Sequence, residues 1–182
     1  MSRPLSVQPV KLIASLLTSE HDLVDQVCAR LTQVWGPLDF VSEALPFDFT
    51  DYYTREFGDG LFRRLISFSG LIEPDRLPAV KLFANDIEDG LLRENGARRI
   101  NIDPGYVSLC HLILATCKPF THRPYLHDGV YADMTLVFRK HSFRRLEWSF
   151  PDYSSEAMIG MLNKIREVYY QQLQEQGELT SG

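Results

Sequence analysis

The sequence predicts a single α+β domain, residues 1–182, in which three helices pack on a mostly antiparallel sheet. Apolar residues recur at helical three-to-four spacing in three separate segments. Between and after these segments lie alternating or continuous apolar runs bounded by glycine, proline and asparagine, a pattern typical of strands. The opening β-α-β-β-α-β order favours a ferredoxin-like sandwich extended by a C-terminal β-hairpin.

The chain is predicted to open with a central strand and a helix. Residues 10–17 are almost continuously apolar, as in a strand buried on both faces of a sheet. Ser19 and Asp22 resemble a capping box, which predicts that a helix begins here. Apolar residues then recur along one helical face as far as Trp35, and Gly36-Pro37 is expected to end the helix.

Two extended segments, 38–45 and 61–72, are predicted before a second helix. Pro74-Asp75 is expected to open that helix, because proline is tolerated in a first turn. Its apolar stripe continues through Leu91, and Asn95-Gly96 is expected to close it.

The second half of the chain is predicted to be mainly strand. A strand at 99–102 is expected to run into a Pro104-Gly105 turn. Further strands are predicted at 109–117, at 125–126 and 130–138 joined by His127-Asp128-Gly129, and at 144–150. Ser154 or Ser155 should cap a last helix, and residues 1–9 and 176–182 are expected to be flexible.

Composition narrows the class of protein. No apolar run approaches the roughly 20 residues of a membrane span, and no signal-peptide core follows the N-terminus, so the sequence predicts a cytoplasmic protein. Three cysteines without a CxxC pair predict reduced, mostly buried thiols. The net charge of −5 gives no evidence for a nucleic-acid partner or a membrane surface, and the oligomeric state stays open.

No phosphate loop, GxGxxG, HExxH or GxSxG motif is present, so any chemistry must come from scattered polar residues. The first candidate group runs from Phe47 to Glu56, where acids and the tyrosines Tyr52 and Tyr53 lie among apolar anchors. They would suit a pocket for a polar ligand or a metal ion. The alternative is a capped turn whose aromatic rings cover a sheet edge.

A second group places Asn101 and Asp103 on one face at a predicted strand end. A carboxylate held there suits a metal ligand or a general base, and an Asx-type turn is the alternative. A third group comprises Lys118, His122, Arg123 and Tyr125, with Asp133 across the predicted hairpin. Its cations suit an anion site, and an Arg123–Asp133 ion pair across the ladder is the alternative.

Other charged residues have simpler interpretations. Lys81, Asn85 and Glu88 share one side of the second helix, where an ion pair on a solvated face is the alternative to a ligand site. The pair Arg63-Arg64 predicts one solvated and one partnered arginine. The segment 151–153 is interpreted as a break after the last strand.

Several stretches taken together resemble a bacterial family catalogued as a domain of unknown function, DUF4416, over nearly the whole chain from about Val10 to Tyr170. They are FDFTDYYTREFG, KLFANDIE, RRINIDPGYV, LATCKPFTHRPYL, GVYADMTL and PDY. The resemblance implies no established activity. The residues on which it directs attention are Thr50, Tyr52, Tyr53, Glu56, Lys81, Glu88, Asn101, Asp103, Gly105, Tyr106, Thr116, Lys118, His122, Arg123, Tyr125, Tyr131 and Thr135. Asp133 stands where the family's acid is expected to be Glu, and Cys117 where Thr is common.

Two hypotheses follow, and whether the chain is an enzyme stays open. In the first, the chain binds or transforms a small anionic, nucleotide-like or phosphorylated ligand, with a divalent metal as a conceivable cofactor. The catalytic residues would be Asp103, Asp133 and His122; the metal ligands would be Asp103, Asp133 and Glu56; and the ligand-binding residues would be Lys81, Asn101, Lys118, Arg123, Tyr52, Tyr53 and Tyr125. In the second, the chain is a non-catalytic interaction domain whose exposed aromatics, such as Tyr52, Tyr53, Tyr106 and Tyr125, form a partner-binding patch.

Overall fold

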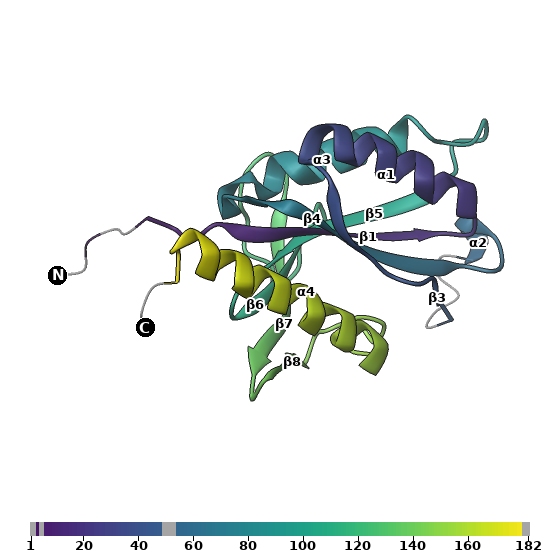
Figure 1. Ribbon diagram of the computed structural model, residues 1–182. Coiled ribbons are helices and arrows are strands. Elements are labelled where there is room, and N and C mark those ends of the chain that lie inside the picture. The colour runs from purple at the N-terminus through teal and green to yellow at the C-terminus, as the bar shows by residue number, and fades with distance from the viewer. Residues whose placement is uncertain (1–2, 4–5, 49–53, 180–182) are drawn as a thin grey trace.

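The structure, a computed structural model, describes residue 3 and residues 6–48 and 54–179 (Figure 1). Its helices are α1 (His21–Trp35), α2 (Thr54–Phe57), α3 (Leu77–Asp89) and α4 (Glu156–Gln176), with a 3-10 helix at Pro74–Arg76. Its strands are β1 (Val10–Thr18), β2 (Leu38–Val41), β3 (Leu45–Pro46), β4 (Phe62–Ile72), β5 (Ile100–Val107), β6 (His111–Thr116), β7 (Tyr131–Arg139) and β8 (Ser142–Arg145). Three long helices and an antiparallel sheet confirm the predicted α+β class.

The sheet is one curled, eight-stranded layer with the order β2-β4-β1-β5-β6-β7-β8, and β3 pairs with β4. Strand β1 lies inside it and is buried along its whole length. Its even-numbered residues, such as Leu12, pack under α1 and α3, whereas Ile13 packs under α4. Figure 1 shows α1 and α3 on one face and α4 on the other. Burial on both faces explains the continuous apolar run and confirms its predicted central position.

The helix ends differ in part from the prediction. The capping box at Ser19 is wrong, because the Ser19 hydroxyl donates to the Phe57 carbonyl (2.8 Å) and α1 begins after Glu20 without a side-chain cap. Helix α3 ends at Asp89 rather than near Asn95. The predicted cap of the last helix is confirmed for Ser155, whose hydroxyl accepts a hydrogen bond from the Met158 amide (3.3 Å).

Three strand predictions need correction. No turn forms at Pro104-Gly105, because β5 runs straight through to Val107. The last predicted strand, 144–150, ends at Arg145, and a turn follows in which the Ser149 amide donates to the Leu146 carbonyl (3.2 Å). The hairpin turn at 127–129 is present, with positive φ at Asp128 and Gly129, but residues 125–126 contribute only an isolated Tyr125–Tyr131 bridge.

The three cysteines are free thiols, as predicted, but they are not mostly buried: Cys28 is half-buried, and Cys110 and Cys117 are exposed. Cys110 and Cys117 lie at the two ends of β6, where the strand meets loops.

In the described part of the chain, no helix has the length and apolar composition needed to cross a membrane.

Candidate functional site

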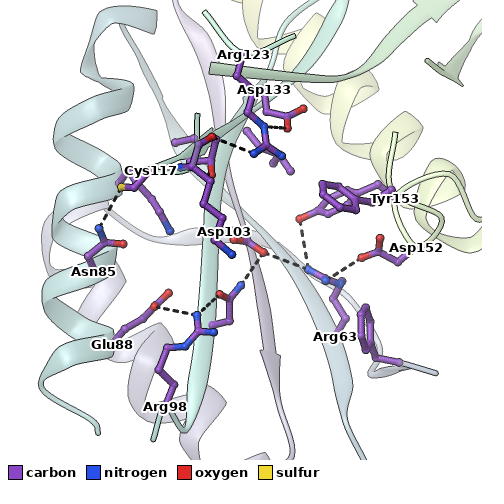
Figure 2. A pocket seen from close by; sticks show the side chains of 18 of the residues that line it. Arg63, Asn85, Glu88, Arg98, Asp103, Cys117, Arg123, Asp133, Asp152 and Tyr153 are labelled. Atoms are coloured by element: carbon purple, nitrogen blue, oxygen red, sulfur yellow. Dashed lines mark hydrogen bonds and ion pairs between the residues drawn. The ribbon is translucent and has the colours of Figure 1, made fainter. Parts of the chain in front are cut away.

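A pocket of about 580 Å³ opens where strands β5 and β6 separate (Figure 2). The two strands pair only through Gly105–Val107 and Leu112–Leu114. The earlier part of β5 continues beside β1 alone. The pocket is lined from α3, β4, β5, the end of β6, β7 and the segment 150–153 that leads into α4.

Two side chains of α3 satisfy the backbone of β5 at the point of separation. The Lys81 ammonium donates to the Ile102 carbonyl (2.9 Å), and the Ile102 amide donates to Glu88 Oε1 (2.5 Å). These are the polar groups that a neighbouring strand would otherwise bind. Lys81 and Glu88 are each only 7% exposed, so the interpretation of this helix side as a solvated face is wrong.

Pro104 and Gly105 fix where the strands part. Backbone direction alternates along a strand, so the Pro104 nitrogen faces the same side as the Ile102 amide and has no hydrogen to offer β6. At Gly105 the strands meet closely: a Cβ there would lie 2.3 Å from the Ile113 carbonyl oxygen. Proline therefore ends the β5–β6 pairing, and glycine permits the close approach beside it.

Asp133 organises one end of the pocket. Its Oδ2 accepts a hydrogen bond from Arg123 Nε (2.7 Å) and lies 3.4 Å from His122 Nε2, while its Oδ1 accepts from the Thr135 hydroxyl (3.2 Å). The Arg123 guanidinium also donates to the Lys118 carbonyl (3.0 Å). The predicted Arg123–Asp133 ion pair is thus confirmed, and both of its members line the pocket (Figure 2).

A chain of polar contacts crosses the opposite side of the pocket. Glu56 holds Arg98 through two hydrogen bonds of 2.7 Å, and Arg98 Nη1 donates to Asn101 Oδ1 (2.8 Å). Asn101 Nδ2 in turn donates to Asp103 Oδ2 (2.7 Å), which confirms that these two side chains share a face. Asp103 lines the pocket, and within the described residues its Oδ1 makes no hydrogen bond.

Arg63 ties this polar chain to the segment before α4. Its Nη1 donates to the Ser15 hydroxyl (2.6 Å) and lies 3.7 Å from Asp103 Oδ2. Its Nη2 lies 2.8 Å from Asp152 Oδ2, and its guanidinium carbon is 5.1 Å from the Tyr153 ring centroid. The segment 151–153 is therefore an anchored wall of the pocket as well as a break after the last strand.

Burial changes the acidity of two lining carboxyl groups. It raises the pKa of Glu88 to about 7, despite the opposing charge of Lys81 and the hydrogen bond from the Ile102 amide. Burial also raises the pKa of Asp152, against the charge of Arg63. The hydrogen bonds from Arg98 instead lower the pKa of Glu56. With a pKa of about 7, Glu88 is partly protonated near neutral pH.

The structure brings most of the predicted site residues together. The pocket lining includes six of them: Lys81, Asn101, Asp103, Lys118, Arg123 and Asp133. His122 does not line the pocket, but its Nε2 lies 3.4 Å from Asp133 Oδ2. Its ring stacks on the Trp148 ring, with 4.9 Å between the centroids. Tyr125 is 60% exposed and does not line the pocket. Tyr52 and Tyr53 lie outside the described residues.

The three acids predicted as metal ligands each pair with a different arginine: Glu56 with Arg98, Asp103 with Arg63, and Asp133 with Arg123. Among the described residues, no group of three or more His, Cys, Asp or Glu side chains is placed to hold a metal ion.

Sequence reasoning missed several lining residues, chiefly Arg63, Arg98, Phe150, Asp152 and Tyr153. Arg63 carries a weak sequence signal, because an arginine at a strand position that faces the protein core requires a buried partner. Pro151, Asp152 and Tyr153 form the PDY stretch of the family resemblance, but no pattern in the sequence places them in the pocket, because only folding brings the segment 150–153 beside β4.

One family model matches the chain, over residues 8–169; its description is "Domain of unknown function (DUF4416)". No curated protein and no solved structure matches the chain.

Proposed function

The chain belongs to the DUF4416 family, and on that premise we propose that its pocket binds a small anionic ligand, such as a phosphorylated metabolite, through Lys118 and Arg123. One observation carries the proposal. Six polar residues that are scattered between positions 81 and 133 of the sequence line a single pocket of about 580 Å³. That volume is within the range of roughly 300–1,000 Å³ common for small-molecule sites.

The charges of the side chains that line the pocket favour an anionic ligand. Five basic side chains, Arg63, Lys81, Arg98, Lys118 and Arg123, face four acidic ones, Glu88, Asp103, Asp133 and Asp152. The raised pKa of Glu88, about 7, means that its negative charge is only partly present at neutral pH. The lining therefore carries an excess of positive charge, and its acids are already engaged by arginines rather than left to repel an anion.

Asp103 supplies a second recognition element. Asn101 fixes its Oδ2, whereas its Oδ1 has no hydrogen-bond partner in the described part of the chain and the side chain is 30% exposed. A hydroxyl or amine of the ligand would donate to this oxygen. Of the three residues predicted to be catalytic, Asp103 is the best placed to accept a proton from a ligand, because Asp133 is 7% exposed and bound by Arg123.

The proposal is tested by calorimetric titration with ribose 5-phosphate and with inorganic pyrophosphate. Lys118→Gln changes an exposed pocket residue, and Lys164→Gln makes the same change on the exposed face of α4. We expect saturable binding that weakens about fivefold or more in Lys118→Gln and is unchanged in Lys164→Gln. Binding should also weaken as salt is added.

A paired variant, Arg123→Gln with Asp133→Asn, removes both charges of a buried ion pair and so avoids leaving either one unpaired. It should bind ribose 5-phosphate more weakly than wild type while retaining the circular dichroism spectrum of the folded protein. Failure of the wild type to bind any phosphate probe, or an equal loss in Lys164→Gln, would refute the anion site.

A second candidate is a protein-interaction surface on the segment between β6 and β7, where Phe120 is 63% and Tyr125 is 60% exposed. Tyr106 does not extend such a patch, because it is half-buried against the cluster around Leu77. Partner capture that is lost in Phe120→Ala and retained in Lys118→Gln would favour this candidate.

We also propose that residues 10–107 form a ferredoxin-like sandwich. The strand order β2-β4-β1-β5 and the packing of α1 and α3 on one face of these strands support it. An experimental structure with a different strand order in this region would contradict the assignment.

A further inference from the structure

We infer that the pocket also holds a planar aromatic ring of its ligand against Phe150, so that the ligand is an aromatic anion such as a nucleoside monophosphate. This inference rests on the proposed anion site and adds the class of molecule that bears the charge. It would assign to segment 146–150 a recognition role that no sequence motif indicates.

Phe150 is an apolar ring presented to the pocket without a partner. It lines the pocket and is 51% exposed. Within the described residues it has no aromatic contact, whereas the Phe47 and Tyr153 rings each lie 5.1 Å from the Arg63 guanidinium carbon. An exposed ring in a concave site is a surface on which a planar ligand group can stack.

The backbone that carries Phe150 is fastened on both sides. Before it, the Trp148 indole donates to the Met134 carbonyl (2.9 Å) and the Ser149 hydroxyl donates to the Thr135 carbonyl (2.5 Å). After it, Asp152 pairs with Arg63 at 2.8 Å. A backbone that is fixed before the ligand arrives does not have to be ordered on binding, so this arrangement lowers the entropy cost of stacking on Phe150.

The ring site and the anion site share one support. The His122 and Trp148 rings stack with 4.9 Å between centroids and 15° between planes. His122 Nε2 lies 3.4 Å from Asp133 Oδ2, the oxygen that also accepts from Arg123 Nε. The segment that carries Phe150 is therefore fixed, through Trp148 and His122, to Asp133. Asp133 in turn positions the Arg123 guanidinium. A ligand that carries both a planar ring and an anionic group would contact Phe150 and Arg123 within the one pocket that both residues line.

Two compounds that differ only in the ring separate this inference from the anion site itself. Adenosine 5′-monophosphate and ribose 5-phosphate share the phosphorylated sugar, so their dissociation constants should be compared by calorimetry on wild type, Phe150→Leu and Tyr125→Leu. Leucine keeps apolar volume and removes the ring. Tyr125→Leu is the matched control, because Tyr125 is an exposed ring outside the pocket lining.

We expect wild type to bind the adenosine compound about tenfold more tightly than ribose 5-phosphate, since stacking of a base on an aromatic ring is worth roughly 1–3 kcal/mol. Phe150→Leu should abolish that preference and leave ribose 5-phosphate binding unchanged. Tyr125→Leu should change neither constant. In a Trp35→Phe background, where Trp148 is the remaining tryptophan, the adenosine compound should alter the fluorescence and ribose 5-phosphate should not.

Equal affinity of the two compounds for wild type, or an equal loss of both in Phe150→Leu, would overturn the ring site and leave the anion site standing. The absence of saturable binding by either compound would overturn both proposals.

Discussion

Glu88 accepts a hydrogen bond from the backbone amide of Ile102 at 2.5 Å, in place of a neighbouring strand. Lys81 binds the carbonyl of the same residue. One helix thus completes the hydrogen bonding of a strand at the point where the sheet opens. The two side chains belong to the fold and to the pocket at once, and their charges affect stability as well as binding.

Stability should depend on pH through Glu88. Its folded-state pKa of about 7 exceeds the ordinary value of 4.5, so the folded protein keeps a proton that the unfolded chain releases. The stabilisation from this proton is complete below pH 4.5 and is lost as the pH rises through about 7. The expected loss is about 3 kcal/mol. Urea unfolding at a series of pH values measures it.

Glu88→Gln keeps an acceptor for the Ile102 amide and removes the titration, so its unfolding free energy should fall less between pH 5 and pH 8 than that of wild type. Glu94→Gln, at an exposed position just beyond α3, should retain the wild-type slope. Identical slopes in all three proteins would show that Glu88 does not titrate in this range.

Lys81→Met should destabilise the protein by roughly 3 kcal/mol, because it leaves the Ile102 carbonyl without its donor and removes one of the two cations beside Glu88, the other being Arg98 at 3.9 Å. Lys164→Met, on the exposed face of α4, should change the unfolding free energy by less than about 0.5 kcal/mol. Denaturant titration of both variants gives the comparison. A loss no larger than that of Lys164→Met would mean that water replaces the Lys81 ammonium at little cost.

Gly105→Ala should destabilise the protein by about 2 kcal/mol or more, because the new Cβ would lie 2.3 Å from the Ile113 carbonyl oxygen, a backbone atom. Gly160→Ala makes the same change in α4, where nothing lies within 4 Å of the added carbon, and should stabilise by about 0.5–1 kcal/mol. Opposite shifts in melting temperature are the expected result. Shifts of the same sign would contradict the close approach of β5 and β6.

Arg63→Met should cost roughly 3–5 kcal/mol, because it leaves the buried Asp152 carboxylate without its cation. Adding Asp152→Asn to this variant should recover part of the loss, since no buried charge then remains unpaired. Thermal unfolding of the single and double variants tests the coupling. Purely additive losses would indicate that the two residues act independently.

The regular elements of the fold were largely predictable because each leaves a local pattern. The apolar run 10–17 predicted β1, and helical spacing predicted α1, α3 and α4. The Pro104-Gly105 turn was wrong for a physical reason: that pair is typical of turns, yet here it lies within a strand whose proline nitrogen faces away from the paired neighbour. Local propensity does not report which side of a strand is paired.

The site was predictable only in part. Asn101, Asp103, Arg123 and Asp133 stood out as polar residues at expected strand ends, and the structure places them in one pocket. Lys81 was predicted to bind the ligand, but its spacing with Glu88 also suits a solvated helix face, and the sequence did not reveal that both side chains are buried. Phe150 and Asp152 join the pocket only through the path of the loop from β8 to α4, which no periodicity records.

An unpaired strand edge can form hydrogen bonds with a strand of another chain, and proteins commonly block such edges to prevent aggregation. Where β5 separates from β6, two side chains block the edge. The Lys81 ammonium and the Glu88 carboxylate bind the Ile102 carbonyl and amide, to which an incoming strand would otherwise bind. The cleft can therefore stay open to small molecules while resisting intermolecular strand pairing at this position.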